Sequence, residues 1–471
     1  MNVGLRRSIL QWRCYSTKSS SLLPTKTIKS HLSDESVPGS NVQVRGWIRS
    51  VRKQKQVCFA NLNDGTTVKG MQAILTPELA ERLSTGACVE MVGTLEQSPG
   101  KEQSKELQVK ELKVLGGSDS TYPLQKKRHS LEFLRSINHL RARGNTGGAV
   151  LRVRHAAAEG LHQFFSKHEF VQINTPILTS HDCEGGGEVF KVTPASSSAS
   201  SEEFFKKPVY LTVSGQLHAE IMASALSRVY TFGPVFRAEE SLTSRHLAEF
   251  WMLEAEIAFI DTLDQLLDVT EANIQDTTEH VLKTCEQDVN FFNQFIDKTL
   301  LERLQASLER PFARMTYTQA IEVLQRAGKN FTYPTTWGSS LQSEHERYLA
   351  AEYCNGPVFV MDYPSDQKPF YMRANDDDGK TVSCFDLLIP GVGELVGGSM
   401  REERYDLLEN KMKSANMDID EYQWYLDLRK YGSAPHGGYG IGFERLMLWL
   451  TGLDNVREVV PVPRWVGHCK Y

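Results

Sequence analysis

The chain has 471 residues, of which 40% are hydrophobic and 24% charged, and its formal net charge is −5. This length fits two or three domains, the apolar content argues against wholesale disorder, and no run of about 18 apolar residues exists to cross a membrane. The acidic total argues against a nucleic-acid partner, but the first 155 residues carry +13 and the remainder −18, so the basic front can still attract a polyanion.

Residues 1–30 are basic and free of acidic side chains, with Arg6, Arg7, Arg13, Lys18, Lys26 and Lys29. An Arg- and Ser-rich start without an apolar core is typical of a mitochondrial transit peptide, which would deliver the protein to the matrix. The run Arg13-Cys14-Tyr15-Ser16 resembles a matrix-protease cleavage site, with cleavage after Tyr15. The alternative is an ordinary disordered basic tail.

Residues 41–116 predict five short strands, which in so short a span favour a small closed β-barrel. The strands are expected at 41–52, 55–64, 68–75, 87–97 and 106–116. Basic residues crowd the first hairpin beside the aromatic Phe59. Oligonucleotide-binding barrels combine cations that follow phosphates with an aromatic ring that stacks on a base. A generic barrel with Phe59 in its core is an equal alternative.

Residues 117–148 read as a linker because proline, a basic run and three glycines interrupt them. A second domain is expected over 149–471. It begins with an amphipathic helix at 151–168, followed by a strand at 169–178 that Pro176 breaks.

The rest of the second domain mixes strands and helices without regular βαβ alternation, which predicts an α+β fold with a mostly antiparallel sheet. Strands are expected at 208–214, 229–240, 247–260, 357–364, 369–375, 382–390 and 391–402, and helices at 216–227, 262–286, 290–307 and 402–414, with a last helix after a glycine-rich stretch. The chain contains neither a dinucleotide-binding G-x-G-x-x-G motif nor a P-loop. It also contains no C-x-x-C pair, the spacing that would suggest a zinc site.

Three segments carry candidate functional residues, and the first is FRAEESLTSRHLAEF. Arg237 sits in an apolar, strand-like run, where a free charge is unusual. Arg245 and His246 lie in the following loop, and Phe250 returns on the next strand. An arginine on a sheet face can clamp a phosphate while a nearby aromatic stacks on a base. A buried ion pair of Arg237 with Glu239 or Glu254 is the alternative.

The second segment is FDLLIPGVGELVGGSMREER, in which Asp386 and Glu394 flank a glycine-rich turn. Two carboxylates beside phosphate-binding arginines suit Mg²⁺, a hard cation that prefers oxygen ligands. In the third segment, HGGYGIGFERLMLWLTG, glycines including Gly442 lead into a helix whose first turn holds Arg445. Backbone N–H groups, the helix N-terminus and an arginine together favour a polyphosphate. Read singly, these features are a turn and a capped helix.

Together these segments resemble the class II aminoacyl-tRNA synthetases. LHQFFSKHEFVQINTPIL is similar to their motif 1, FRAEESLTSRHLAEFWMLEAEIAF to motif 2, and GIGFERLMLWLTGLDNVREVVPVPR to motif 3. The similarity spans residues 41–471 and is greatest to the asparaginyl/aspartyl subgroup, within it to the asparaginyl enzymes. The phrases HDCEGGGEVFKV, LTVSGQLHAE, GGSMREERYDLL and YLDLRKYGSAPHGGYGIGFER carry that choice.

The resemblance implies an enzyme that joins L-asparagine to ATP, releases pyrophosphate and passes the asparaginyl group to tRNA(Asn). Arg237, Glu394 and Arg445 would be the catalytic residues, and Arg237 would contact both the α-phosphate and the amino-acid carboxylate. The residues implied to bind ATP are Arg237, Glu239, Arg245, His246, Phe250, Glu394, Gly442 and Arg445. Glu394 and Asp386 would bind Mg²⁺. Such a site works by positioning and charge stabilisation, without a protein nucleophile.

The resemblance also implies amino-acid contacts. Glu184 would meet the α-ammonium group, Gln216 the backbone end of asparagine, and Arg401 the amide oxygen, beside Arg237. Aspartyl enzymes carry a lysine where this chain has Ala219, and loss of that cation disfavours an anionic side chain. Glu220 could accept the amide N–H₂ and repel aspartate, although a glutamate on a helix surface is the common alternative.

The first domain would be an OB-fold that binds the anticodon, with Phe59 stacking on a base and Gln72 hydrogen-bonding to one. Motif 1 would form a homodimer. One departure is Gly397, where the aspartyl family has a serine, which puts a second side-chain ligand for the metal in doubt.

Other functions are less consistent with the residues. Ala219 and the run SAPHGG speak against an aspartyl or non-discriminating enzyme. The joint presence of Arg237, Glu394 and Arg445 speaks against a non-catalytic RNA-binding relative. Amide synthesis on a free amino acid would not explain the barrel.

Overall fold

The computed structural model describes residues 25–33, 36–100, 103–180, 188–195, 203–377 and 379–471. The chain divides into two compact units, Met1–Arg128 and His129–Tyr471. Most of the predicted transit peptide, residues 1–24, lies outside the described residues.

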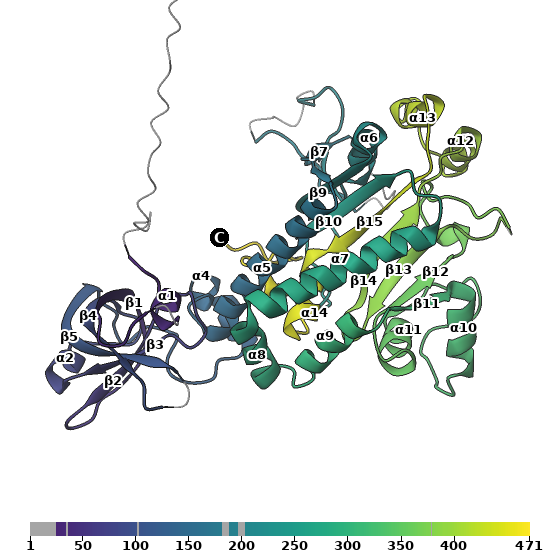
Figure 1. Cartoon of the computed structure of the whole chain (residues 1–471). Coiled ribbons are helices and arrows are strands. Elements are labelled where there is room, and N and C mark those ends of the chain that lie inside the picture. Colours follow the sequence, from purple (N-terminus) through teal and green to yellow (C-terminus); the bar gives the residue numbers. More distant parts are fainter. Residues whose placement is uncertain (1–24, 34–35, 101–102, 181–187, 196–202, 378) are drawn as a thin grey trace, which may run out of the picture. The chain divides into compact units, whose positions relative to one another are not determined.

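The first unit is a closed five-stranded barrel in the order β1-β2-β3-β5-β4 (Figure 1). Its strands are β1 (Asn41–Arg52), β2 (Cys58–Asn63), β3 (Met71–Leu75), β4 (Cys88–Gln97) and β5 (Lys105–Gly116). Buried and less buried side chains alternate along β2, β3 and β4, as a strand with one face on a core requires. The OB-fold prediction is confirmed. Two short helices accompany the barrel, α1 (Ile28–Leu32) and α2 (Pro77–Glu81).

The second unit is built on an eight-stranded sheet in the order β11-β12-β13-β14-β15-β10-β9-β6. The strands are β6 (Val171–Gln172), β9 (Arg228–Phe236), β10 (Glu249–Ala258), β11 (Ala313–Thr316), β12 (Val358–Met361), β13 (Cys384–Ile389), β14 (Gly393–Met400) and β15 (His436–Gly442). Only the outermost pairs, β6–β9 and β11–β12, are parallel. The sheet is thus mostly antiparallel, as predicted. A separate two-stranded sheet joins β7 (Leu178–Thr179) and β8 (Tyr210–Leu211).

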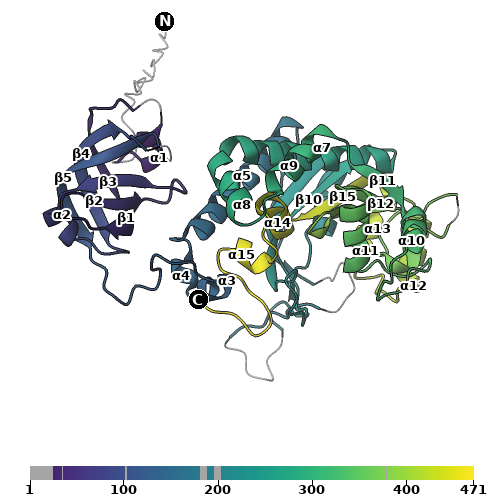
Figure 2. The same cartoon turned by 90° about the horizontal axis from the view of Figure 1, so that it is seen from below.

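Long helices lie along one face of this sheet, as Figures 1 and 2 both show. They are α5 (Asn145–Lys167), α7 (Leu263–Thr284) and α9 (Leu300–Glu309). His162 of α5 lies 2.8 Å from the Tyr230 hydroxyl of β9, and Asn273 of α7 donates to the Tyr439 hydroxyl of β15 at 2.9 Å. Because side chains alternate along a strand, the neighbours of Tyr230 and Tyr439 point to the opposite face. That face is left for a ligand.

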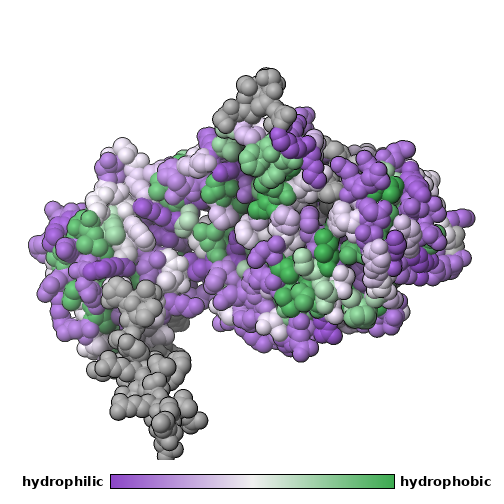
Figure 3. Space-filling model, turned by 90° about the horizontal axis from the view of Figure 1, so that it is seen from above, coloured by the Kyte–Doolittle hydropathy of each residue, from purple (hydrophilic) through white to green (hydrophobic). Residues whose placement is uncertain are grey.

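The remaining helices border the sheet or connect its strands. They are α3 (Leu131–Ser136), α4 (Asn138–Arg141), α6 (Gln216–Leu226), α8 (Glu286–Phe295), α10 (Tyr317–Arg326), α11 (Ser343–Arg347), α12 (Tyr405–Ser414), α13 (Gln423–Lys430), α14 (Phe443–Thr451) and α15 (Val456–Val459), with a π-helical turn at Tyr348–Tyr353 and a 3₁₀ turn at Ser365–Gln367. None of the described helices is both long and apolar enough to span a membrane. The surface seen in Figure 3 is largely hydrophilic, with separate hydrophobic patches.

Several elements differ from the sequence prediction. Helices α3 and α4 and the start of α5 lie within the expected linker. Gly147 and Gly148, two of the glycines that were expected to interrupt the chain, lie inside α5. The strand expected at 369–375 forms only isolated bridges. The helix expected at 290–307 divides into α8 and α9. The glycine-rich stretch before the last helix is the central strand β15 and not a loop.

Candidate active site

Strand register places the predicted site residues on the open face of the sheet. Glu254 and Glu256 of β10 pair with Gly440 and Gly438 of β15, and Gly440 in turn pairs with Gly397 of β14. Paired residues share a face, so these alternate glycines leave the sheet surface bare where a ligand can lie against the backbone. A Cβ at Gly438 would fall 2.2 Å from Glu256 Oε1, so only glycine fits there.

A β-bulge turns Glu394 to the same face as Asp386. Asp386 pairs with Gly397 and Glu394 with Leu388, which leaves Leu395 as an extra residue in β14. In a regular ladder without the bulge, Leu395 would pair with Leu388, and Glu394 would point to the helix-covered face. A Cβ built at Gly397 would lie 3.4 Å from Glu394 Oε1 and 3.7 Å from Asp386 Oδ1. The two predicted metal ligands therefore converge beside this glycine.

A cleft on the open face brings together all the side chains and the glycine predicted to bind ATP. Its lining includes Arg237, Glu239, Arg245, His246, Phe250, Glu394, Gly442 and Arg445. The guanidinium carbon of Arg237 lies 5.5 Å from the centre of the Phe250 ring, and His246 Nε2 lies 3.3 Å from the Glu239 carboxylate. A cation, an aromatic plane and a hydrogen-bonding pair thus line one cavity.

Positive charge is concentrated at one end of this cleft. Arg445 Nη1 donates to the backbone oxygen of Glu394 at 2.7 Å, and Arg245 donates to Ser343 Oγ at 3.0 Å and lies 3.6 Å from Glu346. Burial lowers the pKa of Arg245, Glu346 opposes that shift, and the nearby Arg445 adds to it. Burial and the neighbouring Glu394 raise the pKa of Glu346 to about 6. Arginines held close together in one cleft suit a polyphosphate ligand.

Asp386 has a cationic partner that the sequence reasoning did not anticipate. Lys368 Nζ donates to both carboxylate oxygens, at 2.8 and 3.0 Å, and lies 4.0 Å from the centre of the Tyr363 ring. Although burial opposes it, Asp386 raises the pKa of Lys368. Among the described residues no three His, Cys, Asp or Glu side chains gather as a metal site. Glu394 is more available than Asp386, since its side chain is 44% exposed.

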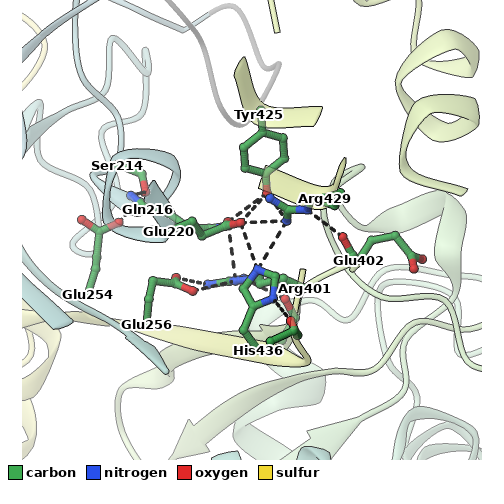
Figure 4. Close-up of polar contacts among 12 residues, drawn as sticks. Ser214, Gln216, Glu220, Glu254, Glu256, Arg401, Glu402, Tyr425, Arg429 and His436 are labelled. Atoms are coloured by element: carbon green, nitrogen blue, oxygen red, sulfur yellow. Dashed lines mark hydrogen bonds and ion pairs between the residues drawn. The ribbon is translucent and has the colours of Figure 1, made fainter. Parts of the chain in front are cut away.

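Three of the residues predicted to bind the amino acid, Gln216, Glu220 and Arg401, lie in a buried polar network (Figure 4). Glu220 is not on a helix surface, because its side chain is fully buried. It accepts hydrogen bonds from Gln216 at 3.1 Å, from the Tyr425 hydroxyl at 2.7 and 2.9 Å, and from Arg429 at 2.8 Å. Both oxygens of the carboxylate are therefore already hydrogen-bonded within the protein.

Arg401 is held chiefly by Glu256. Its Nε and Nη2 donate to the two Glu256 oxygens at 3.2 and 2.5 Å, and its Nη1 donates to Ser399 Oγ at 2.7 Å. Burial raises the pKa of Glu256 to about 7, while Arg401 opposes that rise. Glu254, one step along the same strand face, accepts from the Gly215 backbone N–H at 2.8 Å and from Ser214 Oγ.

The other predicted residues lie elsewhere. Glu184 falls outside the described residues. In the barrel, Phe59 lies between the buried Cys58 and Ala60 and is itself only partly buried, so it points outward and is not a core side chain. The guanidinium of Arg52 lies 4.7 Å from its ring centre. Gln72 shares this outer side, where its side chain donates to Glu106 at 3.1 Å.

Sequence reasoning missed several charged residues of the network, although signals for some of them existed. Glu256 was missed, although it shares its parity with Glu254, the residue considered above as an ion-pair partner of Arg237, in a strand that is apolar apart from Glu249 at its start; two such carboxylates are unusual unless they face a site. Tyr425 and Arg429 are spaced i, i+4 on α13 and so lie on the same side of that helix. Lys368 and Glu346 come from irregular or short segments and gave no periodic signal.

Comparison with known proteins agrees with this geometry. Residues 130–466 match the family "tRNA synthetases class II (D, K and N)", and residues 42–115 match "OB-fold nucleic acid binding domain". The asparagine–tRNA ligase of Thermosynechococcus vestitus is 50% identical over 92% of this chain and 97% of its own length. The chain belongs to the asparagine–tRNA ligase family of class II synthetases. The ligase of Protochlamydia amoebophila is 50% identical over 92% of this chain and 96% of its own length.

Solved structures of the family share the architecture. The asparaginyl-tRNA synthetase of Pyrococcus horikoshii, complexed with asparaginyl-adenylate, superposes with a TM-score of 0.84 at 31% identity and covers 95% of this chain and 100% of its own. The Entamoeba histolytica asparaginyl-tRNA synthetase, also with asparaginyl-adenylate, gives 0.81 at 31% identity over 92% of this chain and 97% of its own. These family members thus share an N-terminal OB-fold that is followed in sequence by an α+β catalytic domain.

Proposed function

We propose that this chain activates L-asparagine with ATP and charges tRNA(Asn) in the mitochondrial matrix. The observation that supports it most is that one face of the sheet holds both the arginine-lined cleft and, beside it, the buried network around Glu220 and Arg401. A nucleotide and an amino acid held side by side on one surface would have their reacting groups close together.

In the first step the carboxylate of asparagine would attack the α-phosphorus of ATP, and pyrophosphate would leave. Arg237 would bridge the two reactants, because its cation suits both the carboxylate and the α-phosphate. Phe250 would stack on the adenine, with Glu239 and Gly442 beside the nucleotide. Arg245, His246 and Arg445 would hold the outer phosphates and balance the charge on the departing pyrophosphate.

Mg²⁺ is part of this proposal, and the residues present fit it. Magnesium in nucleotide sites is commonly held by one or two carboxylates together with the substrate phosphates, so a cluster of three protein ligands is not required. Glu394 would hold the ion, and Asp386 would contribute once its pairing with Lys368 loosens. Bound there, the ion would neutralise charge on the phosphates.

For the amino acid, Arg401 and Glu220 would read the side-chain amide, Gln216 the backbone end, and Glu184 the α-ammonium. The absence of a lysine at Ala219, which is completely buried, supports a preference for a neutral side chain. The full engagement of Glu220 with Tyr425 and Arg429 means that a direct contact to substrate would have to share these oxygens.

The adenylate would then react with the terminal adenosine of tRNA(Asn), whose anticodon the barrel would bind through Phe59 and Gln72. We also propose that the chain forms a homodimer through motif 1. The segment that follows α5 supports this, since Val171, Ile177 and Leu178 are 45%, 42% and 44% exposed, an unusual display of large apolar side chains in one short segment.

The mitochondrial assignment rests on residues 1–30 alone. Fusing them to a fluorescent protein should direct it to mitochondria, and the mature protein isolated from cells should lack residues 1–15. A fusion that stays in the cytosol would remove the mitochondrial part of the proposal and leave the enzymatic part intact.

The enzymatic proposal is tested by ATP–pyrophosphate exchange with asparagine and aspartate compared, followed by charging of tRNA(Asn). Exchange that depends on asparagine is the expected result. Exchange with aspartate only would overturn the asparagine assignment, and no exchange with either amino acid would overturn the activity itself.

A further inference from the structure

Arg429 is the strongest partner of Glu220, yet it belongs to none of the three class II motifs. It comes from α13, and its Nη2 donates to Glu220 Oε2 at 2.8 Å and to the Tyr425 hydroxyl at 3.0 Å. Its Nε donates to the backbone oxygen of Glu402 at 2.9 Å, which fixes the plane of the guanidinium. Figure 4 shows Arg429 and Tyr425 on one side of Glu220 and Arg401 on the other.

Arg401 cannot substitute for Arg429 in balancing Glu220. Two of its nitrogens are occupied by Glu256, and its closest approach to Glu220 is 3.9 Å. The pKa of Glu220 is lowered overall, although burial raises it. Among the charges that lower this pKa, Arg429 contributes most, ahead of His436 and Arg401. Glu220 is therefore ionised chiefly because Arg429 lies beside it.

Four buried side chains form two ion pairs around this point. Glu220 pairs with Arg429, and Glu256 pairs with Arg401, with side-chain exposures of 0, 1, 1 and 3%. With Glu256 ionised beside Arg401, the two carboxylates and two guanidinium groups carry no net charge. His436, whose Nε2 lies 3.4 Å from Glu220, also faces the cluster.

Two further titratable groups border the cluster. Tyr425 holds its phenol proton, since burial raises its pKa well above the usual range. Glu254 lies on the Ser214–Gly215 side, where burial raises the pKa of its carboxyl and Arg237 is the first charge that opposes the rise. Arg401 also acts on Glu254, where its charge opposes the rise in the pKa.

A neutral buried cluster discriminates between neutral and charged ligands. Adding a carboxylate to it places an uncompensated charge among buried side chains, which is costly, whereas an amide adds only dipoles. Removing one carboxylate from the cluster would leave a net positive site that tolerates a carboxylate ligand.

We propose that Arg429 is a positioning residue for amino-acid selectivity, which keeps Glu220 ionised and in place so that the buried cluster has no net charge and admits asparagine but rejects aspartate. This inference rests on the proposed function. In a direct mechanism, Glu220 would select asparagine by hydrogen-bonding to its amide. Here selectivity depends instead on the net charge of the cluster that contains the Glu220–Arg429 ion pair.

The test compares Glu220→Gln, Arg429→Met and the double variant by pyrophosphate exchange with asparagine and with aspartate. Glu220→Gln leaves one excess positive charge, and we expect its preference for asparagine over aspartate to fall by about 100-fold, the effect of one unit charge at about 5 Å with an effective dielectric constant of about 20. The double variant again has no net charge. Its preference should return to within about tenfold of the unaltered protein, even if its overall rate is lower.

Arg429→Lys keeps the charge and should retain the preference for asparagine, while Arg429→Met should raise the KM for asparagine and leave the KM for ATP unchanged. Lys430→Met, which removes the neighbouring exposed cation of α13, is the matched control. Because selectivity is a ratio within one preparation, partial misfolding of a variant does not affect it.

A double variant that stays as unselective as Glu220→Gln would overturn the proposal, since direct contact alone would then explain selectivity. So would an Arg429→Met variant whose two KM values rise equally. If the unaltered protein does not use asparagine at all, the proposed function fails first, and the two failures are distinguishable.

Discussion

Arg237 stands at the end of β9, next to the Phe250 ring, in a cleft where several cations converge. Replacing it with alanine should abolish adenylate formation, because a cation aimed at the developing charge contributes about 100- to 1,000-fold to such a reaction. Pyrophosphate exchange measures this directly. Arg228→Ala, at the opposite and exposed end of the same strand, should leave the exchange rate unchanged. A rate retained in Arg237→Ala would remove this residue from phosphate binding.

Glu402 illustrates a different role for a buried charge at the residue scale. It is fully buried and accepts from Arg404 at 2.6 and 3.0 Å and from the Ala374 N–H at 3.1 Å. Although burial opposes the shift, Arg404 and Ala374 lower the pKa of Glu402. A carboxyl whose pKa is lower in the folded state stabilises the fold above its unfolded pKa, and that contribution disappears as the pH falls through the folded value.

Glu402→Gln should therefore reduce the free energy of unfolding at pH 7 by about 2 kcal/mol, the usual range for hydrogen bonds to a charged group. The difference from the unaltered protein should persist at pH 5 and shrink at pH values below about 4. Denaturant unfolding at several pH values measures it. A difference that stays constant down to pH 3 would show that the carboxylate charge is not what stabilises this site.

The residues that line the cleft could be predicted from sequence because each lies within a short segment that also holds its neighbours. The charge network could not, because its members come together only through tertiary packing. Glu220 and Arg429 are 209 positions apart, and Glu256 and Arg401 are 145 apart. The i, i+4 spacing of Tyr425 and Arg429 places them on one side of a helix but does not show what that side faces.

At the scale of elements, α5 and α14 are joined by one buried ion pair. Arg154 of α5 donates to Glu444 of α14 at 2.8 Å, and the other Glu444 oxygen accepts from the Trp251 N–H at 3.0 Å. Burial raises the pKa of Glu444, while Arg154 opposes that rise. Glu444 precedes Arg445, so this pair ties the long helix α5 to the start of the helix that carries a predicted phosphate ligand.

Arg154→Met should destabilise the catalytic unit by about 3 kcal/mol, because it leaves a buried carboxylate without its partner. Arg154→Met combined with Glu444→Gln should be less destabilised than Arg154→Met alone. Chemical denaturation of both variants and of Glu444→Gln completes a double-mutant cycle. A strictly additive cycle would indicate that the two side chains do not interact energetically.

The outer side of β2 and β3 is the part of the barrel where an anticodon base would stack. Phe59→Ala should raise the KM for tRNA in aminoacylation by about 5- to 150-fold, the contribution of one stacked base, while pyrophosphate exchange stays unchanged. Leu115→Ala, which trims an exposed apolar side chain of β5, should affect neither assay. Equal losses in both assays for Phe59→Ala would contradict a role in tRNA binding.

Strands and long helices were mostly predictable from periodicity, and the errors have physical causes. The segment at 369–375 has strand-like composition, but it is held by isolated bridges on two sides and cannot extend a ladder. The stretch HGGYGIG lacks the side chains that signal a strand. It is nevertheless β15, because β10 and β14 hold it from both sides through backbone hydrogen bonds.

For the whole molecule, oligomeric state is the property least accessible from a single chain. The sheet ends at β6, a two-residue edge strand with both residues exposed, and exposed edges invite pairing with another chain. If motif 1 forms the dimer interface, Val171→Asp combined with Ile177→Asp should convert a dimer to a monomer in sedimentation velocity. Phe295→Asp, at an equally exposed apolar residue of α8, should not. An unaltered chain that sediments as a monomer would contradict the dimer itself.

Net charge was a poor guide to the partners of the whole molecule. The total of −5 averages a basic first third and an acidic remainder, whose cleft nevertheless brings three arginines together. Long-range attraction to a polyanion depends on where charges lie and not on their sum.

The bulge at Leu395 has a consequence for how this protein can change over evolutionary time. Most insertions and deletions in a hairpin shift a loop and are absorbed there. Here the bulge between Glu394 and Val396 decides which side of the sheet Glu394 points to. Pairing the same residues in a regular ladder would preserve every side chain and still send the carboxylate into the helix layer, whereas deleting Leu395 would leave Glu394 opposite Leu388. In aligned relatives, loss of the residue at Leu395 should therefore be compatible with retained catalysis.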